Sequence, residues 1–490
     1  MSATHAIAQF QTEDGTVLDT QIDLPLDVTN EQLTMLLNRL LENDEPQPYA
    51  FFIEHVYRMS GSTSSSSQPS LLAGQEEITD SLERAVKASG VSLEQALRII
   101  YVPQAIFRVE AVNRCHATLE GHTEAVLAVA FSPDSLHFAS ASGDSTVRLW
   151  DIHTNTPLAT LKGHTDWVLS LSWAPDGKRL ASGDNKGNVI VWDPFSGKKI
   201  TSCNGHRRFV TSLSWEPLHK DGECTRFASS SKDGTVIVWH AITGNKLFHI
   251  SGHTASVTAV LWGGEGLLYS ASQDRTIKVW TDDGRLCRTL ETHGHWVNTL
   301  SLNDGYLLRT GWWDPARPEA KAPKTPDAAQ ALALARYAEF KKGTPKELLA
   351  SGSDDFTLCL WDPTSAKKPI IRMTGHQQPV NIVSFSPDGR YIASASFDKS
   401  VKVWNGRDGA FIATFRSHVG PVYQVCWSSD SRLLVTGSRD STVKIFSPAT
   451  KKLVSDLPGH ADEVYAVDWS PDGARVGSAS KDKTVKIWVM

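Results

Sequence analysis

A histidine, a serine, an aspartate and a tryptophan recur together along this chain, as in His122, Ser140, Asp144 and Trp150. In one pocket, the first three side chains could form a nucleophilic triad, in which histidine removes the hydroxyl proton and aspartate orients the histidine. A catalytic site is needed only once, however, and this group recurs in nearly every unit of a repeated sequence. Repeated copies are typical of hydrogen bonds that satisfy buried polar groups. We therefore predict a structural network and a chain that is not an enzyme.

The repeat begins at a histidine, usually after glycine, and ends about 28 residues later at the aromatic end of a hydrophobic run. Successive histidines lie 42, 42, 47, 40, 83, 42 and 42 residues apart. So regular a period predicts stacked or radial repeats, and only the fifth unit departs strongly from it. The eight units run from His122 to Trp150, His164 to Trp192, His206 to Trp239, His253 to Trp280, His293 to Trp361, His376 to Trp404, His418 to Phe446 and His460 to Trp488.

The aspartate lies six residues before the aromatic residue in seven units, whereas the second unit has Lys186 there. Thr292 and Ser417 replace the glycine of two units, and Phe446 replaces one tryptophan. These departures are expected to weaken single blades without breaking the period. The predicted structural network comprises His122, Asp144, Trp150, His164, Trp192, His206, Asp233, Trp239, His253, Asp274, Trp280, His293, Asp355, Trp361, His376, Asp398, Trp404, His418, Asp440, His460, Asp482 and Trp488.

Within each unit, short runs of alternating apolar residues are separated by turn residues, a pattern that predicts β-strands. Three strands fit between histidine and tryptophan, and a fourth fits before the next Gly-His pair. Such sheets need neighbours on both faces, which a ring of blades provides. Because the sequence stops just after the third strand of the eighth unit, residues 115–120 are expected to supply its fourth strand and close the ring. We predict an all-β, eight-bladed propeller over residues 115–490.

The fifth unit contains about forty extra residues, 309–347. The first half of this insertion is rich in proline and lysine and is expected to be an exposed arm. The second half predicts a helix with Asp327 as its N-cap after Pro326. Insertions in a rigid scaffold often carry partner contacts, and a passive surface loop is the alternative. The apolar side of the predicted helix comprises Ala331, Leu334, Ala335 and Ala338.

Residues 1–108 precede the repeats and follow a different pattern. The order strand, strand, helix, strand, helix, strand suggests an α/β ubiquitin-like grasp fold. Residues 60–72 are expected to form a flexible loop, because they are rich in serine. A linker over 109–114 would join this domain to the propeller. The predicted strands span 5–11, 16–24, 49–57 and 97–101, and the predicted helices begin at Thr29-Asn30 and near Ile78.

Charge is divided unevenly between the two parts of the chain. The net charge is −5, with 16 acidic and 6 basic residues in 1–110, and 38 acidic and 43 basic residues in the remainder. This division suggests different partners for the two parts, with RNA near the basic one. An ordinary solvated surface is the alternative.

Several classes of site and location are not expected from this sequence. The six cysteines are scattered without a C-x-x-C spacing, as in buried thiols of a reducing compartment. The sequence has neither a basic leader followed by an apolar run nor a long apolar stretch, so we expect neither export nor a membrane span. No phosphate-binding loop, H-E-x-x-H motif or clustered Cys/His set is present. We therefore expect no intrinsic cofactor, bound metal or small-molecule substrate.

The units resemble the WD-repeat family, whose signatures appear as Gly163-His164 with Trp192-Asp193 and as Trp361-Asp362 with Gly375-His376. The front domain, the eight units and the fifth-unit insertion together resemble the Notchless family of ribosome-assembly factors. That similarity spans nearly the whole chain. It is carried by segments such as SLEQALRIIYVPQAIFRV, WVLSLSWAPDG, RFVTSLSWEP and MTGHQQPVNIVSFSPDGRYIASASFD.

The resemblance implies a non-enzymatic assembly factor of the large (60S) ribosomal subunit, located in the nucleus and nucleolus. Its propeller would dock on the precursor particle, which contains ribosomal RNA and other assembly factors. Its front domain would be bound by the adhesion site of midasin, an AAA-type ATPase that pulls on the particle. An adaptor in signalling or in a ubiquitin-ligase complex is the alternative, because propellers serve both classes. A propeller hydrolase is a third, which a single deep pocket with a perturbed acid or nucleophile would reveal.

The resemblance also implies one site residue, Glu94 in GVSLEQALRIIY. In the family, an acid just before the last strand of the front domain contacts the Mg²⁺ that the adhesion site of the partner holds. A hard cation with an open position can accept one more carboxylate oxygen. The residues alone do not single Glu94 out, because Asp80 and Glu83 compete with it and most loop acids are simply solvated.

Overall fold

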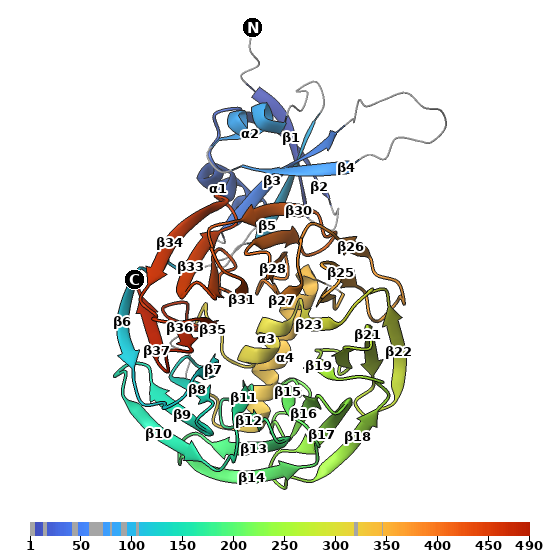
Figure 1. Ribbon diagram of the computed structural model, residues 1–490. Coiled ribbons are helices and arrows are strands. Elements are labelled where there is room, and N and C mark those ends of the chain that lie inside the picture. Colours follow the sequence, from blue (N-terminus) through green and yellow to red (C-terminus); the bar gives the residue numbers. More distant parts are fainter. Residues whose placement is uncertain are drawn as a thin grey trace. The chain divides into compact units, whose positions relative to one another are not determined.

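The computed structural model describes residues 5–12, 17–41, 48–57, 72–78, 81–89, 96–103, 107–317, 322–344 and 346–490 (Figure 1). The chain divides into two compact units, Met1–Arg108 and Val109–Met490. No helix among the described residues is long and apolar enough to cross a membrane. Of the loop expected over 60–72, only Leu72 lies within the described residues.

The first unit is an α/β domain with one mixed sheet in the order β2-β1-β5-β3-β4. β1 and β5 run parallel in the centre, and the other pairs are antiparallel. This arrangement confirms the expected grasp fold and adds a strand, β4, that the sequence pattern did not predict. The elements are β1 His5–Thr12, β2 Val17–Pro25, α1 Asn30–Leu40, β3 Tyr49–Tyr57, β4 Leu72–Glu77, α2 Leu82–Ser89 and β5 Leu97–Pro103.

The helix α1 begins where the sequence predicts it. The Thr29 side chain accepts from the Gln32 backbone N–H, and the Gln32 side chain accepts from the Thr29 backbone N–H, which forms a capping box. Leu33 and Leu37 then face the sheet and are fully buried in the core of this unit, with Phe10.

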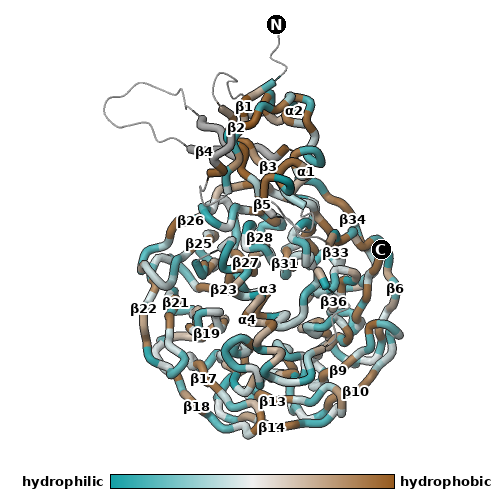
Figure 2. The backbone as a smooth tube through the Cα atoms, turned by 180° about the vertical axis from the view of Figure 1, so that it is seen from behind, coloured by the Kyte–Doolittle hydropathy of each residue, from teal (hydrophilic) through white to brown (hydrophobic). Residues whose placement is uncertain are grey.

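The second unit is a ring of eight antiparallel four-stranded sheets, which confirms the predicted propeller. The strands of each blade are given from the centre outward. Blade one consists of β7 Val126–Phe131, β8 His137–Ser142, β9 Thr146–Asp151 and β10 Pro157–Lys162, and blade two of β11 Val168–Trp173, β12 Leu180–Asp184, β13 Asn188–Asp193 and β14 Lys198–Asn204. Blade three consists of β15 Val210–Trp215, β16 Arg226–Ser231, β17 Thr235–His240 and β18 Lys246–Ser251, and blade four of β19 Val257–Trp262, β20 Leu268–Ser272, β21 Thr276–Trp280 and β22 Leu286–Glu291. The second strands of these blades are buried almost throughout, as expected for sheets that pack on both faces, and Figure 2 shows hydrophobic residues distributed all round the ring.

Blades five to eight follow the same pattern. Blade five consists of β23 Val297–Leu302, β24 Leu349–Ser353, β25 Leu358–Trp361 and β26 Ile371–Met373, and blade six of β27 Val380–Phe385, β28 Tyr391–Ser396, β29 Val401–Asn405 and β30 Phe411–Phe415. Blade seven consists of β31 Val422–Trp427, β32 Leu434–Ser438, β33 Thr442–Ser447 and β34 Lys452–Pro458, and blade eight of β35 Val464–Trp469, β36 Val476–Ser480, β37 Val485–Val489 and β6 Arg114–Leu119.

The ring closes through the eighth blade, as the sequence predicts. β6 pairs antiparallel with β37, with Lys486 opposite Thr118 and Val485 opposite Leu119. The residues expected to be a linker also belong to this unit. Val109 and Val112 are buried, and the Val109 backbone N–H donates to Asp430 Oδ2 at 2.8 Å. The segment 109–114 is therefore packed against the propeller.

The propeller has two faces, which differ in their loops. The His-side face is formed by the loops that carry the Gly-His pairs and by the loops between the second and third strands of each blade. The insertion-side face is formed by the loops between the first and second strands and between the third and fourth. The fifth-unit insertion lies on the latter face, because it joins β23 to β24.

The segment that joins β23 to β24 begins before residue 309 and contains two helices, α3 Gly305–Thr310 and α4 Pro326–Gly343, which lie across the middle of the ring in Figure 1. Two details differ from the sequence prediction. The N-cap of α4 is Thr325, whose side chain accepts from the Ala328 N–H, and Pro326 takes the first helical position. The predicted apolar side of α4 is exposed, and the buried residues are instead Ala329, Ala333 and Tyr337.

Candidate functional site

In blade one the recurrent residues form a single chain of hydrogen bonds. The Trp150 indole N–H donates to Ser140 Oγ at 2.9 Å, and Ser140 Oγ lies 2.9 Å from His122 Nε2. His122 Nδ1 lies 2.8 Å from Asp144 Oδ2. Because an ionised carboxylate only accepts, His122 Nδ1 carries a proton and donates it to Asp144. Each polar side chain of the group thus has a partner inside the blade.

The same arrangement recurs around the ring. The distance from histidine Nδ1 to the carboxylate is 2.7–3.1 Å in all eight blades. The tryptophan N–H to serine distance is 2.7–3.0 Å in the seven blades that have tryptophan. Blades two to eight join His164 to Asp184, His206 to Asp233, His253 to Asp274, His293 to Asp355, His376 to Asp398, His418 to Asp440 and His460 to Asp482.

These groups are not arranged for nucleophilic attack. Ser140 is fully buried, and its oxygen is already hydrogen-bonded to both Trp150 and His122. Burial alone would raise the pKa of Asp144, but hydrogen bonds from His122 and Thr146 hold that pKa well below its usual value. An ionised aspartate and the histidine bonded to it therefore form a structural pair within each blade.

Blade two departs from the sequence prediction in an informative way. Lys186 occupies the position where the other blades have aspartate, yet His164 still has a carboxylate partner. Asp184, two residues earlier, lies 3.0 Å from His164 Nδ1 and is fully buried. Asn188 completes the group by donating to Asp184 through its side chain and backbone. The expectation that Lys186 weakens this blade overlooked the shifted acid.

Blade seven compensates for its missing tryptophan. Thr436 takes the place of the serine and lies 2.7 Å from His418 Nε2. Phe446 offers no N–H, and Thr436 Oγ1 instead lies 3.2 Å from the carbonyl oxygen of Lys444, to which it can donate. The Phe446 ring stacks on Phe415 with centroids 4.7 Å apart, so apolar packing replaces the lost hydrogen bond.

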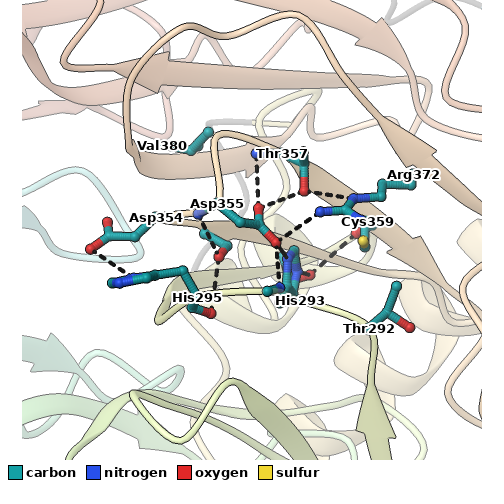
Figure 3. A network of polar contacts seen from close by, with 12 residues as sticks. Thr292, His293, His295, Asp354, Asp355, Thr357, Cys359, Arg372 and Val380 are labelled. Atoms are coloured by element: carbon teal, nitrogen blue, oxygen red, sulfur yellow. Dashed lines mark hydrogen bonds and ion pairs between the residues drawn. The ribbon is translucent and has the colours of Figure 1, made fainter.

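Blade five carries an additional ion pair in its network (Figure 3). Arg372 of β26 donates to Asp355 Oδ2 and to Thr357 Oγ1, each at 3.1 Å. The neighbouring His295 lies 3.6 Å from Asp354 on the exposed side. The fifth unit therefore keeps a complete network despite the insertion between its first two strands.

The insertion binds to the far side of the ring through α3. Arg309 donates to both carboxylate oxygens of Asp468 in blade eight, with Nη1 at 2.8 Å from Oδ1. Asp468 also accepts from the Phe131 backbone N–H of blade one at 2.8 Å. The Tyr306 hydroxyl donates to the Pro471 carbonyl at 3.2 Å. An element of blade five is thus attached to blade eight, next to the closure.

Arg309→Met is expected to lower the free energy of unfolding by about 3 kcal/mol, because it leaves the buried Asp468 carboxylate without its charged partner. Asp468→Asn in the same chain should recover part of this loss, since asparagine still accepts from the Phe131 N–H. Arg317→Met removes an exposed arginine of the same insertion and is the matched control. Urea unfolding monitored by tryptophan fluorescence measures all three variants. Equal stability of Arg309→Met and Arg317→Met would contradict the bracing role.

The helix α4 is held by blades three and four. The Tyr337 ring stacks on His219 with centroids 4.2 Å apart, and Gln330 donates to the His219 carbonyl at 3.2 Å. Lys341 Nζ lies 2.7 Å from Glu265 Oε1. The insertion is therefore packed on the propeller along its described length, and Trp313, in the segment expected to be an exposed arm, is also buried.

A buried acidic pair lies where the insertion meets blades four and five. Glu347 accepts from the Tyr269 hydroxyl and from the Glu265 backbone N–H, the latter at 3.0 Å. Asp304 is 1% exposed, and neither of its carboxylate oxygens has a hydrogen-bond partner in the described part of the chain. Burial raises the pKa of Asp304 well above its ordinary value of 3.8, and the charge of Glu347 raises it further.

Asp304→Asn is expected to stabilise the protein by about 1–3 kcal/mol near neutral pH, since the carboxamide can donate where the carboxylate lacks a partner. The gain should grow with pH. The raised pKa means that the folded parent keeps a proton that its unfolded chain releases above 3.8, so the parent loses stability as pH rises. Urea unfolding of both chains at about pH 5 and about pH 8 measures this difference. A gain that shrinks with pH would contradict it.

The inner strands and α3 line a partly open cavity of about 350 Å³. Its lining includes Trp173, Trp215 and Trp262 of blades two to four, with Arg309 and Asp468 at one side. The charges of Arg309 and Asp468 in this cavity already neutralise each other. Among the described residues, no group of three or more His, Cys, Asp or Glu side chains is placed to hold a metal ion.

Two basic pairs of the sequence lie on opposite faces of the propeller. Arg207-Arg208 precede Phe209 on the His-side face in blade three, between β14 and β15. Lys367-Lys368 lie on the insertion-side face, between β25 and β26. All four basic side chains are exposed.

The candidate partner contact Glu94 lies outside the described residues, as does Asp80. The third acid considered, Glu83, is exposed on α2 and forms an ion pair with Lys87 at 2.6 Å. Glu94 therefore stays a prediction, placed by sequence between α2 and β5.

Comparison with known families matches both units. The NLE (NUC135) domain matches residues 6–86. The WD domain, G-beta repeat, matches eight times, at residues 113–151, 155–193, 197–240, 244–281, 344–362, 367–405, 409–447 and 451–489. The fifth match is short because the insertion separates the first strand of that blade from the others.

Three relatives show similarity over most of both chains. Protein Notchless of Drosophila melanogaster is 48% identical over 387 residues, 78% of this chain and 74% of the relative. The Notchless protein homolog of Arabidopsis thaliana is 49% identical over 83% of this chain and 81% of the relative. Ribosome assembly protein 4 of Saccharomyces cerevisiae is 46% identical over 83% and 79%.

A crystal structure of the computationally designed Ika8 protein is also similar. It is 27% identical, with a TM-score of 0.60, and the match covers 76% of this chain and 98% of that chain. The NLE domain, the eight WD repeats and the identity to these relatives together show that the chain belongs to the Notchless family.

Proposed function

We propose that this protein is a non-enzymatic assembly factor of the large (60S) ribosomal subunit. The observation that carries the proposal is the 46% identity to a protein named Ribosome assembly protein 4, over 79% of that relative. Its propeller would dock on the precursor particle, and its front domain would be bound by a midasin-type AAA ATPase. The protein would act in the nucleus and nucleolus, where such particles are assembled.

The division into two compact units supports this scheme. A factor that holds a particle while an ATPase pulls on it needs a rigid platform and a separate handle. The propeller supplies the first through ring closure by β6 and through the Arg309 to Asp468 pair across the ring. The front domain supplies the second, and its excess of acidic residues favours a partner that presents a cation.

Glu94 is the residue that we propose for the contact. A Mg²⁺ held by an adhesion site has hard oxygen ligands and one open position, and a protruding carboxylate can complete its coordination. The metal would belong to the partner, so this chain would need no cofactor of its own. In the sequence, Glu94 stands between the residues of α2 and those of β5, where the resemblance to the family puts the contact.

Co-sedimentation in sucrose gradients tests the proposed function. A tagged chain expressed in cells is expected to move with large-subunit precursors and to be absent from the small-subunit fractions. Recovery only with a signalling or ubiquitin-ligase complex would overturn the proposal in favour of an adaptor.

A further inference from the structure

Cationic and aromatic side chains gather on the His-side face where blades two and three meet. Trp167 follows the Gly-His pair of blade two and is 56% exposed. Arg207 and Arg208 follow the pair of blade three, and both are exposed. We call this surface the basic aromatic patch, and it comprises Trp167, Lys186, Arg207, Arg208, Phe209 and Lys232.

The loops of the patch are held by backbone contacts. The Asn185 N–H donates to the Trp167 carbonyl at 2.9 Å, and the Lys232 N–H donates to the Phe209 carbonyl at 3.0 Å. Gly187, in the turn between β12 and β13 of blade two, has φ +88 and packs closely against the loop of blade three. A Cβ at this position would lie 2.7 Å from the Arg208 carbonyl oxygen. The patch is therefore presented by a preformed surface, which lowers the entropy cost of binding.

The positive charge of the patch faces solvent. Among the nearby acids, Glu124 of blade one is exposed beside Trp167, whereas the others are engaged in contacts of their own. Neither the Arg207 nor the Arg208 guanidinium has a hydrogen-bond or ion-pair partner within the described ranges. Asp184 and Asp233 point inward to the histidines of their networks. Asp166 is partly buried and accepts from the Asn185 side chain at 3.2 Å.

Trp167 offers a stacking surface on the same face, in the blade next to these arginines. Its indole ring lies over Gly143 of blade one, where a Cβ would be 3.6 Å from the ring. Lys232 Nζ lies 5.0 Å from the centre of the Phe209 ring, so cation and aromatic group are interleaved there as well. Bases stack on exposed aromatic rings while arginine and lysine bind phosphates.

Three basic side chains of the opposite face are already paired where the insertion packs on the ring. Arg309 is paired with Asp468, Lys341 with Glu265 and Lys346 with Asp362. The insertion also covers part of that face through α4. A polyanion at the basic aromatic patch would meet Arg207 and Arg208, which have no ion-pair partner within the described ranges.

We propose that the basic aromatic patch binds single-stranded RNA, with a base on Trp167 and phosphates at Arg207, Arg208, Lys186 and Lys232. If the proposed function holds, this RNA is an unpaired segment of the large-subunit precursor. An unpaired strand fits better than a duplex, because a base in a duplex cannot stack on an added ring.

Fluorescence anisotropy of the full chain with a labelled single-stranded RNA of about 12 nucleotides tests the inference. Arg207→Ser with Arg208→Ser is expected to weaken binding at least about tenfold and to lower the salt slope by about 1.4, as two lost phosphate contacts require. Trp167→Ala is expected to weaken binding at least about fivefold with an unchanged salt slope, because it removes stacking and no charge. The same sequence as a duplex should bind more weakly than the single strand.

The opposite face provides matched controls. Lys367→Ser with Lys368→Ser removes the same charge, and Phe195→Ala removes a ring that is 68% exposed between β13 and β14. Both should bind RNA like the parent, and thermal unfolding verifies that each variant is folded. The inference would be overturned if the patch variants bound RNA with the same affinity as the control variants. It would also be overturned if the parent bound no RNA at about 50 mM salt.

Co-sedimentation separates this inference from the proposed function. A chain that moves with large-subunit precursors but binds no RNA leaves the proposed function standing and overturns the patch. A chain that binds RNA through the patch but never meets a precursor supports the patch and overturns the proposed function. Patch variants that keep RNA affinity but lose a protein of the particle would show a protein partner and overturn the RNA assignment.

Discussion

A chain that ends at Pro458, and so lacks blade eight, is expected to lose the cooperative unfolding transition of the propeller. The truncation removes β35, β36 and β37, and it leaves β6 without the strand that it pairs with. It also removes Asp468, which joins the Phe131 N–H of blade one to Arg309 of the insertion. Blades one and seven would each expose an apolar face.

The core between blades one and eight shows how much is lost. Phe131 and Phe138 of blade one are fully buried in one cluster with Ala466, Ala479 and Ile487 of blade eight. Domains of ordinary stability unfold at a cost of about 5–15 kcal/mol, and losing both interfaces of one blade in a closed ring should remove most of that. Circular dichroism during heating measures the transition.

A chain that begins at residue 109 is the control for this truncation. It removes more residues but leaves the ring of eight blades intact, so its propeller should unfold like that of the parent. A chain ending at Pro458 that melts close to the parent would contradict closure through β6.

Glu94→Ala is expected to abolish metal-dependent binding of the front domain to the adhesion domain of the ATPase while folding is unchanged. Removing one partner of a close, desolvated charge contact costs about 2–5 kcal/mol, which is at least about 30-fold in Kd. Glu94→Asp should also weaken binding, because its carboxylate is withdrawn by one C–C bond of about 1.5 Å. Calorimetry with the adhesion domain in Mg²⁺ or with a chelator measures the loss.

Two other acids of the front domain are the controls for Glu94. Glu83→Ala removes an exposed acid of α2 that is paired with Lys87, and Asp80→Asn removes a second competitor. Both should bind the adhesion domain like the parent. Loss of binding on changing Glu83 or Asp80, with Glu94→Ala unaffected, would transfer the contact to another residue.

The blades could be predicted because their signals are local and repeated. Each strand has its own alternation of apolar residues, and the Gly-His to Trp spacing sets the blade length. Closure by residues 114–119 was predictable for the same reason, since this segment precedes the first Gly-His pair as other fourth strands precede theirs. β4 was missed because LAGQEE lacks such alternation.

The polar network was predictable in kind but not in every residue. Sequence position alone indicated that blade two lacks the carboxylate partner of its histidine, because Lys186 stands where other blades have aspartate. In the fold, Asp184 contacts His164 instead. The signal was present in the sequence, because blade two has an acid where blade one has Ser142. Equivalence in space had to be known before that acid could be recognised.

The insertion was the least predictable part. α4 is apolar on two sides, so periodicity selected Ala331 and Leu334, which are exposed, and missed Ala333 and Tyr337, which are buried. Arg309 and Asp468 are 159 residues apart, and no local pattern links them. Such contacts depend on the tertiary arrangement of the ring.

Release from the particle tests the account most directly. Large-subunit precursors carrying the tagged parent or the Glu94→Ala chain would be purified, incubated with the ATPase and ATP, and separated on a gradient. The account predicts that both chains dock equally, that ATP releases the parent, and that the Glu94→Ala chain stays bound. Equal release of both chains, or a parent that never docks, would contradict it.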